Sequence, residues 1–468
     1  MATTTDSAAP PAAATVPVRR HVSDLLLLAW PVMLSRAGIL VMAFADTAML
    51  GRYLPGAVGT MNLGLAVFVP VLVVSIGLAS GMVPVVAQAF GGGRWEECGR
   101  AWRRAVSWAT FVSLIAMAIV WRAEWVLGLS WFDLTPEQAR AGGDVAVILA
   151  PGLIAQVMFA VCAFYLEATR RPFIGLYAMI LANILNAALN WVMIYGNLGW
   201  PEMGPDGAAL ASTLARVGAA GFMFAVIFGQ RDALAAGVRG PWETVWGPGG
   251  WRAGYQMRKL GFSAGMANGF ETVGFAAMML FAGSLGAAAL DAYSISHNMV
   301  STVFMVGLGL AIATGVRVGQ ELGAGRPRDA VVAGWTGFFM CFAVMGIMSV
   351  LVITFREDVV RAYTDDPEIA ARAATVFLVA ALIFVPDALQ VVMGQSVRAL
   401  GDAWVPIAAY VLSFVVVLVP LGQVMIGPVG MDERGLAWAI IISCALATVL
   451  LAWRFHWLTR PPGPKVPG

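Results

Sequence analysis

The chain has 468 residues, of which 60% are hydrophobic and only 12% are charged, and its formal net charge is +2. A soluble domain carries about 45–50% apolar and about 25% charged residues. A soluble chain of this length could not cover its surface with so few charges, so we expect most of it to be solvated by lipid. The four cysteines lie far apart without a C-x-x-C spacing, which indicates neither a zinc site nor a disulfide framework.

The start of the chain is rich in Ala, Pro and Thr over its first eighteen residues. It lacks the basic segment, apolar segment and small-residue cleavage site that together define a signal peptide. We therefore expect residues 1–23 to form a cytoplasmic tail that leads into the first membrane span.

Twelve apolar runs follow, each close to or above the ~20 residues that a helix needs to cross ~30 Å of hydrocarbon. Because backbone groups in lipid must bond within their own segment, each run is predicted to be a helix. The runs cover residues 24–50, 57–88, 104–123, 145–168, 173–195, 207–229, 258–284, 289–318, 331–354, 373–397, 404–426 and 435–457. The sequence thus predicts an all-α polytopic membrane protein with twelve transmembrane helices.

The distribution of Lys and Arg tests this count, because cytoplasmic loops carry an excess of positive residues. With both termini in the cytoplasm, most of the 29 Lys and Arg residues fall in inner segments and far fewer in outer loops. Arg36, Arg216 and Arg317 are left inside or near the ends of spans. An error in the helix count would scramble this alternation beyond the error. We therefore predict a multi-pass protein of the cell membrane with both termini cytoplasmic.

Two segments of the chain resemble each other. Ile76–Arg94 reads IGLASGMVPVVAQAFGGGR, and Leu308–Arg326 reads LGLAIATGVRVGQELGAGR. At an offset of 232 residues the identical pairs are Gly77 and Gly309, Leu78 and Leu310, Ala79 and Ala311, Gln88 and Gln320, Gly91 and Gly323, Gly93 and Gly325, and Arg94 and Arg326. Both copies lie where a helix leaves the membrane on the cytoplasmic side, so the chain contains two related halves.

The offset covers six helices, an even number, so the halves have the same orientation. They are expected to form two six-helix lobes related by a pseudo-two-fold axis along the membrane normal, one of the known transporter designs. The predicted division is an N-lobe at 24–229, a cytoplasmic linker at 230–257, a C-lobe at 258–457 and a cytoplasmic tail at 458–468.

Three carboxylates inside predicted spans are the candidates for a functional role: Asp46 late in the first, Glu271 in the middle of the seventh and Asp387 in the middle of the tenth. An ionisable side chain inside a span costs about 2.5–3.5 kcal/mol on insertion scales, so each is a functional candidate. Carboxylate oxygens bind hard cations or a proton. The alternative is that a neighbouring donor satisfies each carboxylate, which then has only a structural role.

The fifth helix carries Asn186 and Asn190, which are four residues apart and share a helix face. On that face they are placed to hydrogen-bond a carboxylate of the same half, and the alternative is that they link helices without a role in binding. On the seventh helix, Gly261, Gly265 and Gly269 form a stripe that predicts close helix packing. Glu271 follows Gly269 by about 200° around the helix and is expected to face away from this stripe.

Other polar residues fit structural roles. Glu167 is expected to pair with Arg170 and Arg171 beside it, and Asp291 and Glu321 are expected to be solvated near the ends of the eighth span. His297 is either a proton carrier or a packing residue, and packing is the more common role of a lone intramembrane histidine. Arg36 cannot reach Asp46, because ten residues of helix separate them by about 15 Å.

Four motifs in order resemble the multidrug and toxic compound extrusion (MATE) family, and within it the NorM-like branch. They are PVMLSRAGILVMAFADTAMLGR in the first helix, NAALNWVMIYG in the fifth, GFSAGMANGFE in the seventh and PDALQVVMGQSVRALGD in the tenth. The resemblance covers nearly the whole chain. Ser263 stands where the family usually has a proline, and Arg36 where a neutral polar residue is usual.

This resemblance implies a V-shaped pair of lobes that exports bulky, often aromatic organic cations by alternating access, in exchange for Na⁺ or H⁺. It implies that Asp46 with Asn186 and Asn190 forms the cation site of the N-lobe. It implies likewise that Glu271 and Asp387 form the cation site of the C-lobe, and this acidic pair points towards a Na⁺ site.

The sequence bears on three other functions. An enzyme would need a set of catalytic or metal-binding groups, and the three scattered histidines supply none. A channel would need a polar filter, and no such stretch interrupts the spans. The main alternative is a lipid or oligosaccharide flippase of related architecture, for which Arg36 and Arg216 are the only support. We expect no resident cofactor besides the coupling ion, no nucleic-acid partner, and a monomer in the lipid bilayer.

Overall fold

The computed structural model describes residues 17–54, 56–129, 134–242, 250–361, 363 and 366–460, and every regular element in them is a helix. The elements of the first half are α1 (Val18–Tyr53), α2 (Ala57–Ser80), α3 (Met82–Gly91), α4 (Trp95–Val120), α5 (Ala123–Leu127), α6 (Pro136–Ala168), α7 (Phe173–Met193), η1 (Asn197–Gly199) and α8 (Gly204–Gly229). Those of the second half are α9 (Gly250–Ala253), α10 (Tyr255–Ser284), α11 (Ala287–Gly323), α12 (Pro327–Thr354), α13 (Arg356–Arg361), α14 (Pro367–Ala399), α15 (Trp404–Tyr410), η2 (Val411–Val417), α16 (Leu418–Ile426) and α17 (Glu433–Leu458).

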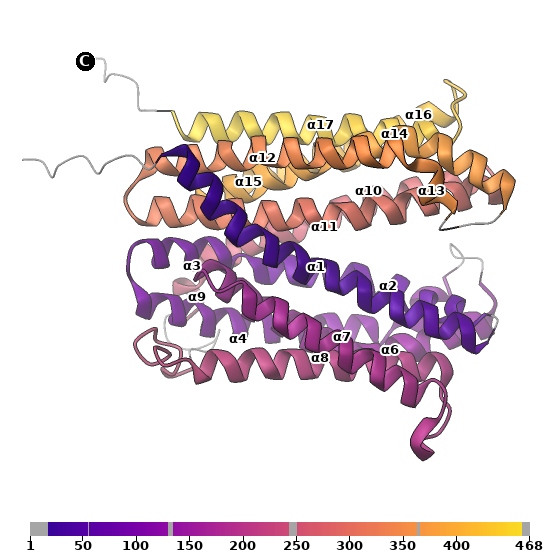
Figure 1. The fold of residues 1–468 in the computed structure, drawn as a ribbon, viewed down its shortest axis with the longest axis horizontal. Coiled ribbons are helices and arrows are strands. Elements are labelled where there is room, and N and C mark those ends of the chain that lie inside the picture. The colour runs from indigo at the N-terminus through magenta and orange to yellow at the C-terminus, as the bar shows by residue number, and fades with distance from the viewer. Residues whose placement is uncertain are drawn as a thin grey trace, which may run out of the picture.

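Each predicted span corresponds to one long helical unit. Two of the units are composite: α2 continues into α3 past Gly81, and α15 continues through the π-helical turn η2 into α16. Among the described residues, 11 helices are long and apolar enough to cross a membrane. The remaining unit, α10, is 30 residues long and runs alongside them (Figure 1). Polar residues such as Asn268 and Glu271 lower its hydropathy. The twelve-helix polytopic fold predicted from the sequence is therefore confirmed.

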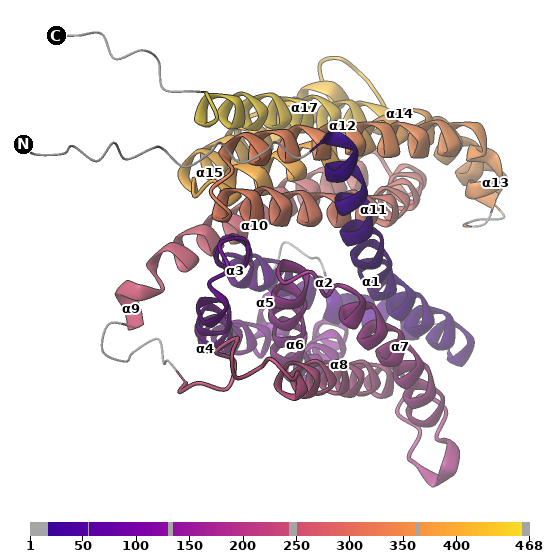
Figure 2. The ribbon, with the colours of Figure 1, turned by 60° about the vertical axis from the view of Figure 1, so that its left-hand side comes forward.

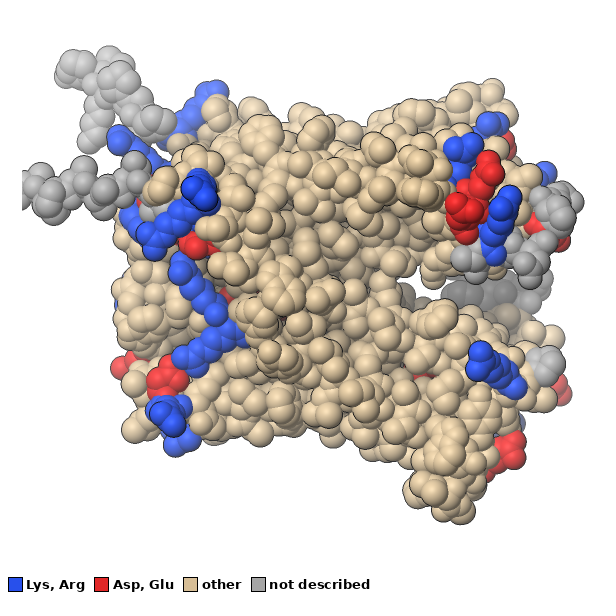
Figure 3. Space-filling model, in the orientation of Figure 1, with Lys and Arg blue, Asp and Glu red and all other residues tan. Residues whose placement is uncertain are grey.

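The distribution of charged residues over the surface fits a molecule whose middle part is embedded in a membrane. Figure 3 shows Lys, Arg, Asp and Glu gathered at the two ends of the molecule, with a broad band between them that carries almost none. α1 begins and α17 ends at the same end of the molecule, as an even number of spans requires (Figure 1). We call this the terminal end and the opposite one the far end.

The helices extend beyond the apolar runs that predict them. α1 begins at Val18, inside the segment expected to be a tail, and α6 begins at Pro136, before the run that starts at residue 145. The start of α6 is favoured locally by a capping box, in which Gln138 N donates to Thr135 Oγ1 and Thr135 N donates to Gln138 Oε1. Hydropathy marks the lipid-crossing part of a helix and not its polar ends. The residues of the predicted tail at 1–16 lie outside the described residues.

The helices form two lobes, and α1 crosses diagonally over the junction between them (Figure 1, Figure 2). α1 packs against α7 of the first lobe and against α11 and α12 of the second. Two further large contacts between the lobes join α2 to α10 and α3 to α11. The predicted glycine stripe lies in the contact between α2 and α10, because Gly261 and Gly265 pack directly against Leu78 and Gly269 lies opposite Val74. The packing role predicted for the stripe is confirmed.

Candidate functional site

The first polar cluster surrounds Asp46, whose side chain is buried on α1. Asn186 and Asn190 of α7 donate from Nδ2 to Asp46 Oδ1 at 3.0 Å and 2.6 Å. Ser212 of α8 donates from Oγ to Asp46 Oδ2 at 2.6 Å. Three helices of the first lobe therefore converge on one carboxylate. The structure brings together all three residues that the sequence assigned to this site, and it adds Ser212.

A positive charge lies beside this cluster. Arg216 is one helical turn beyond Ser212 on α8, close enough for its charge to act on Asp46. Its guanidinium carbon lies 5.0 Å from the centre of the Phe68 ring, within the range of a cation–π contact. Arg216 therefore acts on Asp46 through its charge, and this electrostatic interaction gives Arg216 the role that the sequence left open.

The second polar cluster joins Glu271 of α10 to Asp387 of α14. Gln390 lies one turn after Asp387, and its Nε2 donates to Glu271 Oε1 at 3.1 Å and to Asp387 Oδ1 at 3.2 Å. Cys444 of α17 donates from Sγ to the same Asp387 oxygen at 3.7 Å. Glu271 thus faces α14, away from the glycine stripe, as predicted.

Gln390 separates the two carboxylates and satisfies an oxygen of each. Its side chain is fully buried, and its own Oε1 has no hydrogen-bond partner within the described part of the chain. A hard cation prefers oxygen ligands. Glu271, Asp387 and the Gln390 amide oxygen are therefore the groups that could hold one, with the amide turned so that its oxygen faces the carboxylates.

The two clusters share one design. Each has a buried carboxylate on a long helix and a side-chain amide that donates a hydrogen bond to it, from α7 in the first cluster and from α14 in the second. They differ in charge, because Arg216 acts on the single carboxylate Asp46, whereas Arg398 acts on one of two carboxylates, Glu271, beside Asp387. The first cluster is therefore nearly charge-balanced, and the second has an excess of negative charge that attracts a cation.

Arg36 pairs with Glu167, the last acidic residue of α6. Arg36 Nη2 lies 3.0 Å from Glu167 Oε1 and 3.3 Å from Oε2, and the two side chains are only 7% and 5% exposed. The expectation that Glu167 pairs with Arg170 and Arg171 is wrong. Arg170 instead donates to Gln320 of α11, and Arg171 donates to Asp232, which follows α8.

Glu321 is buried rather than solvated, so that expectation is also wrong. It pairs with Arg317 at 2.6 Å and with Arg326 at 2.5 Å at the end of α11. Sequence position alone places it near a helix end, but α1 and α12 cover that end. Asp291 is exposed, as predicted.

His297 packs among aromatic rings. Its ring lies parallel to that of Tyr293 at 6.2 Å and tilted to that of Phe275 at 5.6 Å. It also lines a small, mostly apolar cavity with Val300, Val376 and Ile383, among other residues. These contacts fit the packing role.

Three residues of the clusters were missed by sequence reasoning: Ser212, Gln390 and Cys444. Gln390 had a usable signal, because it follows Asp387 by three residues and so shares its helix face. Ser212 and Cys444 are small residues of types common in membrane helices, and only the packing of α8 and α17 brings them to the carboxylates.

Known proteins resemble this chain over most of its length. The family model described as MatE matches residues 31–192 and 264–424, and these two segments are offset by nearly the 232 residues of the internal repeat. A probable multidrug resistance protein NorM of Caulobacter vibrioides is 32% identical over 447 residues, 94% of this chain and 93% of that protein. A multidrug resistance protein NorM of Vibrio vulnificus is 27% identical over 456 residues, 94% of this chain and 96% of that protein.

Solved structures share the fold. A crystal structure of the eukaryotic MATE transporter AtDTX14 superimposes with a TM-score of 0.84 at 16% identity, covering 94% of this chain and 99% of that one. A multidrug resistance MATE family transporter in an outward-facing conformation gives a TM-score of 0.80 at 16% identity, covering 95% and 98%. The fold and its two clusters define a two-lobe, multi-pass helical membrane protein with a buried acidic cluster in each lobe. The chain belongs to the MatE family.

Proposed function

We propose that the protein is a cation-coupled antiporter that exports bulky organic cations and drugs across the cell membrane by alternating access. Its termini and its linker lie in the cytoplasm, on the side favoured by the distribution of Lys and Arg. The relatives whose names refer to multidrug resistance support the substrate class. The protein works as a monomer and contributes to drug resistance of the cell that carries it.

The observation that carries this proposal is the presence of one buried carboxylate cluster in each lobe. A buried carboxylate needs a compensating partner, and its fixed negative charge favours a cationic cargo over an anionic one. A coupling ion and an organic cation that compete for such a group cannot occupy it together. Entry of the ion therefore releases the drug, which is the physical basis of exchange.

Glu271 and Asp387 are the residues we assign to the coupling ion, which is Na⁺ in our proposal and H⁺ in the alternative. Two carboxylates with an amide between them supply oxygen atoms for a metal ion. Asp46, held by Asn186, Asn190 and Ser212, is assigned to the organic cation or to a proton. No resident cofactor takes part in this scheme.

A flippase is the less favoured function, because it would need a strongly cationic cavity. Arg36 and Arg216 were its only support in the sequence. Arg36 is neutralised by Glu167 at 3.0 Å, and Arg216 lies beside Asp46. Neither arginine offers an unbalanced positive charge to an anionic headgroup.

Ethidium export from proteoliposomes, driven by an imposed Na⁺ gradient or an imposed pH gradient, tests the proposal. Export that is driven by Na⁺ and lost in Asp387→Asn supports the assignment of the C-lobe cluster. Export that is driven only by the pH gradient and lost in Asp46→Asn transfers coupling to the N-lobe. If the wild-type protein exports no organic cation under either gradient, the proposal is refuted and the flippase is favoured.

A further inference from the structure

The terminal end of the molecule is closed by two contacts that follow the internal repeat. Gln88 of α3 donates from Nε2 to the backbone oxygen of Ala399 at 2.8 Å. Gln320 of α11 donates from Nε2 to the backbone oxygen of Ala168 at 2.9 Å. Gln88 and Gln320 are equivalent residues of the repeat, and Ala399 and Ala168 are the last residues of α14 and α6.

Each of these hydrogen bonds crosses from one lobe to the other. The last carbonyls of a helix have no partner within that helix, so they need an outside donor when they are buried. Here the donor is a glutamine of the opposite lobe in both cases. The two bonds are therefore reciprocal caps: each lobe satisfies a helix end of the other.

Glycines allow the backbones to come close enough for these bonds. A Cβ atom at Gly91 would overlap the backbone oxygen of Gln320, and one at Gly323 would overlap that of Gln88. These glycines are also equivalent in the repeat. A Cβ at Gly319 would lie 2.9 Å from the Cβ of Ala87, its own equivalent residue, so this contact lies on the pseudo-two-fold axis. The geometry of the whole junction is thus symmetric.

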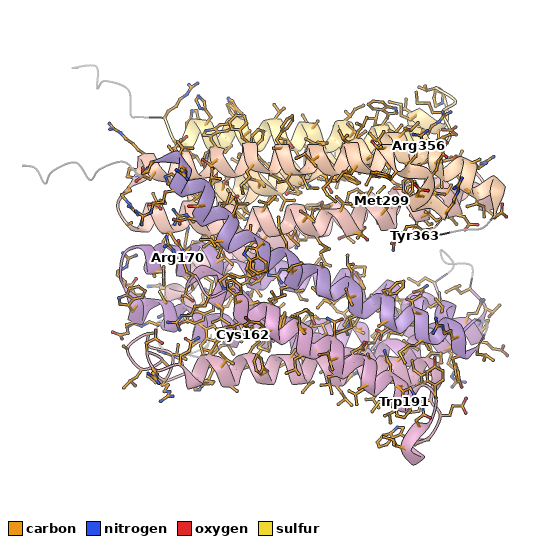
Figure 4. All side chains as sticks on the ribbon, in the orientation of Figure 1. Cys162, Arg170, Trp191, Met299, Arg356 and Tyr363 are labelled. Atoms are coloured by element: carbon orange, nitrogen blue, oxygen red, sulfur yellow. The ribbon has the colours of Figure 1, made fainter. Side chains whose placement is uncertain are left out.

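Charged residues reinforce the Gln320 half. Gln320 Oε1 accepts from Arg170 Nε at 3.0 Å and from Arg317 Nη1 at 3.4 Å. Arg317 also pairs with Asp24 of α1 at 3.2 Å. Figure 4 labels Arg170 at the terminal end, where the two lobes meet.

The backbone conformation of Arg170 is unusual for an arginine, and the hydrogen bond from its side chain to Gln320 of the opposite lobe explains it. Its φ is 61°, a left-handed conformation that is unfavourable for any residue with a Cβ and that usually selects glycine after a helix. A glycine there would relieve the backbone but remove the guanidinium from Gln320. The contact across the lobes gives a physical reason for an arginine at this position.

We propose that Gln88 and Gln320 form a two-part clasp that holds the terminal end shut, and that the Gln320 half is the stronger of the two. This inference rests on the proposed alternating-access function, since a state open at the terminal end must break both bonds. The far end is hollowed between the lobes in the same structure (Figure 3). The clasp therefore stabilises the state that is closed at the terminal end and open at the far end.

Distances between spin labels on the two lobes test the clasp without any transport measurement. Ala235→Cys places a label on an exposed linker residue, next to Ala236, whose backbone oxygen accepts from Gly99 N of α4 in the first lobe. Ala324→Cys places the second label on an exposed residue at the end of α11 in the second lobe. The four native cysteines are buried, so they stay unlabelled. The distance distribution in lipid nanodiscs then gives the ratio of the open to the closed terminal end for each clasp variant.

Each glutamine variant is expected to raise that ratio. Because one hydrogen bond is lost and one helix end is left unpaired, Gln88→Ala should raise it about 3-fold. Gln320→Ala should raise it about 10-fold, since it also frees Arg170 and Arg317. Arg170→Ala should raise the ratio in the wild-type background but add little in the Gln320→Ala background. Gln423→Ala, at an exposed residue of α16, is the matched control and should leave the ratio unchanged.

A second label pair at the far end, Arg52→Cys with Ser284→Cys, separates opening from unfolding. Opening of the terminal end shortens the far-end distance, whereas unfolding broadens both distributions. If folded Gln88→Ala and Gln320→Ala proteins keep the wild-type ratio, the clasp is refuted even when ethidium export is intact. If both variants open the terminal end but the wild type exports no organic cation, the clasp stands and the proposed function fails.

Discussion

The buried ion pair between Arg36 and Glu167 makes a quantitative prediction about stability. The two side chains are 7% and 5% exposed and their closest atoms are 3.0 Å apart. The guanidinium carbon also lies 5.4 Å from the centre of the Phe164 ring. Because breaking a buried pair leaves an uncompensated charge, Glu167→Gln is expected to lower the free energy of unfolding by about 3–5 kcal/mol.

The double variant Arg36→Met, Glu167→Leu is expected to be more stable than either single variant. It removes both charges together, and replacing a buried ion pair by apolar residues of similar size is often neutral or stabilising. Most of the unfolding free energy lost in a single variant therefore comes from the buried charge that is left without a partner. The measurement is a double-mutant cycle of unfolding free energies, obtained by titration with a denaturing detergent.

An exposed pair provides the control for this cycle. Arg361 and Asp358 of α13 are both 74% exposed and 4.0 Å apart. Because water screens the charges, such an exposed pair contributes little to the free energy of unfolding, so Arg361→Ala and Asp358→Ala should leave it unchanged within error. The reasoning is refuted if the effects of Arg36→Met and Glu167→Leu simply add, or if Glu167→Gln costs less than about 1 kcal/mol, the upper value for an exposed pair.

Three further predictions follow from the contacts. Ser212→Ala removes a hydrogen bond to the buried carboxylate of α1 and should cost about 1.5–3 kcal/mol in unfolding free energy, whereas Ser212→Thr keeps the hydroxyl and most of the stability. Gly261→Ala should weaken the contact between the lobes and lower the thermal midpoint, whereas Gly346→Ala, with open space around it, should leave it unchanged or slightly raised; equal effects would contradict the packing role. The hydrogen bond from Arg171 lowers the pKa of Asp232 in the folded protein. This pair therefore stabilises the fold above the ordinary Asp pKa of about 4, and the stabilisation is lost as the pH falls through the pKa that Asp232 has in the folded protein. The difference in stability between wild type and Arg171→Ala should therefore shrink from pH 7 to pH 3 in paired unfolding titrations, and a constant difference would show that the pair does not set this pKa.

Much of the architecture could be predicted from the sequence. Hydropathy located the twelve helical units, and the repeat around Gln88 and Gln320 located the related halves. Helix periodicity and the family resemblance together predicted that Asn186 and Asn190 lie close to Asp46. These features depend on local composition or on spacing along one helix, which a sequence displays directly.

Contacts between side chains on different helices could not be predicted from the sequence in the same way. Nothing near Glu167 in the chain indicates Arg36, because 131 residues separate them and only the diagonal course of α1 brings them together. The same holds for Ser212, which is a small residue among many until α8 packs against α1. For Glu321, its place near a helix end predicted exposure, but neighbouring helices bury it.

The sequence by itself determined the solvent of this protein, its helices and its two-fold repeat, because lipid imposes apolar runs of fixed length and a duplicated chain keeps its motifs in register. Only the tertiary structure decided which charges neutralise one another and which helix ends are capped across the lobes. Those choices depend on angles and crossings between helices far apart in the chain. At the junction, the repeat supplied two equivalent glutamines, and the packing of α3 against α11 directed each of them to the opposite lobe.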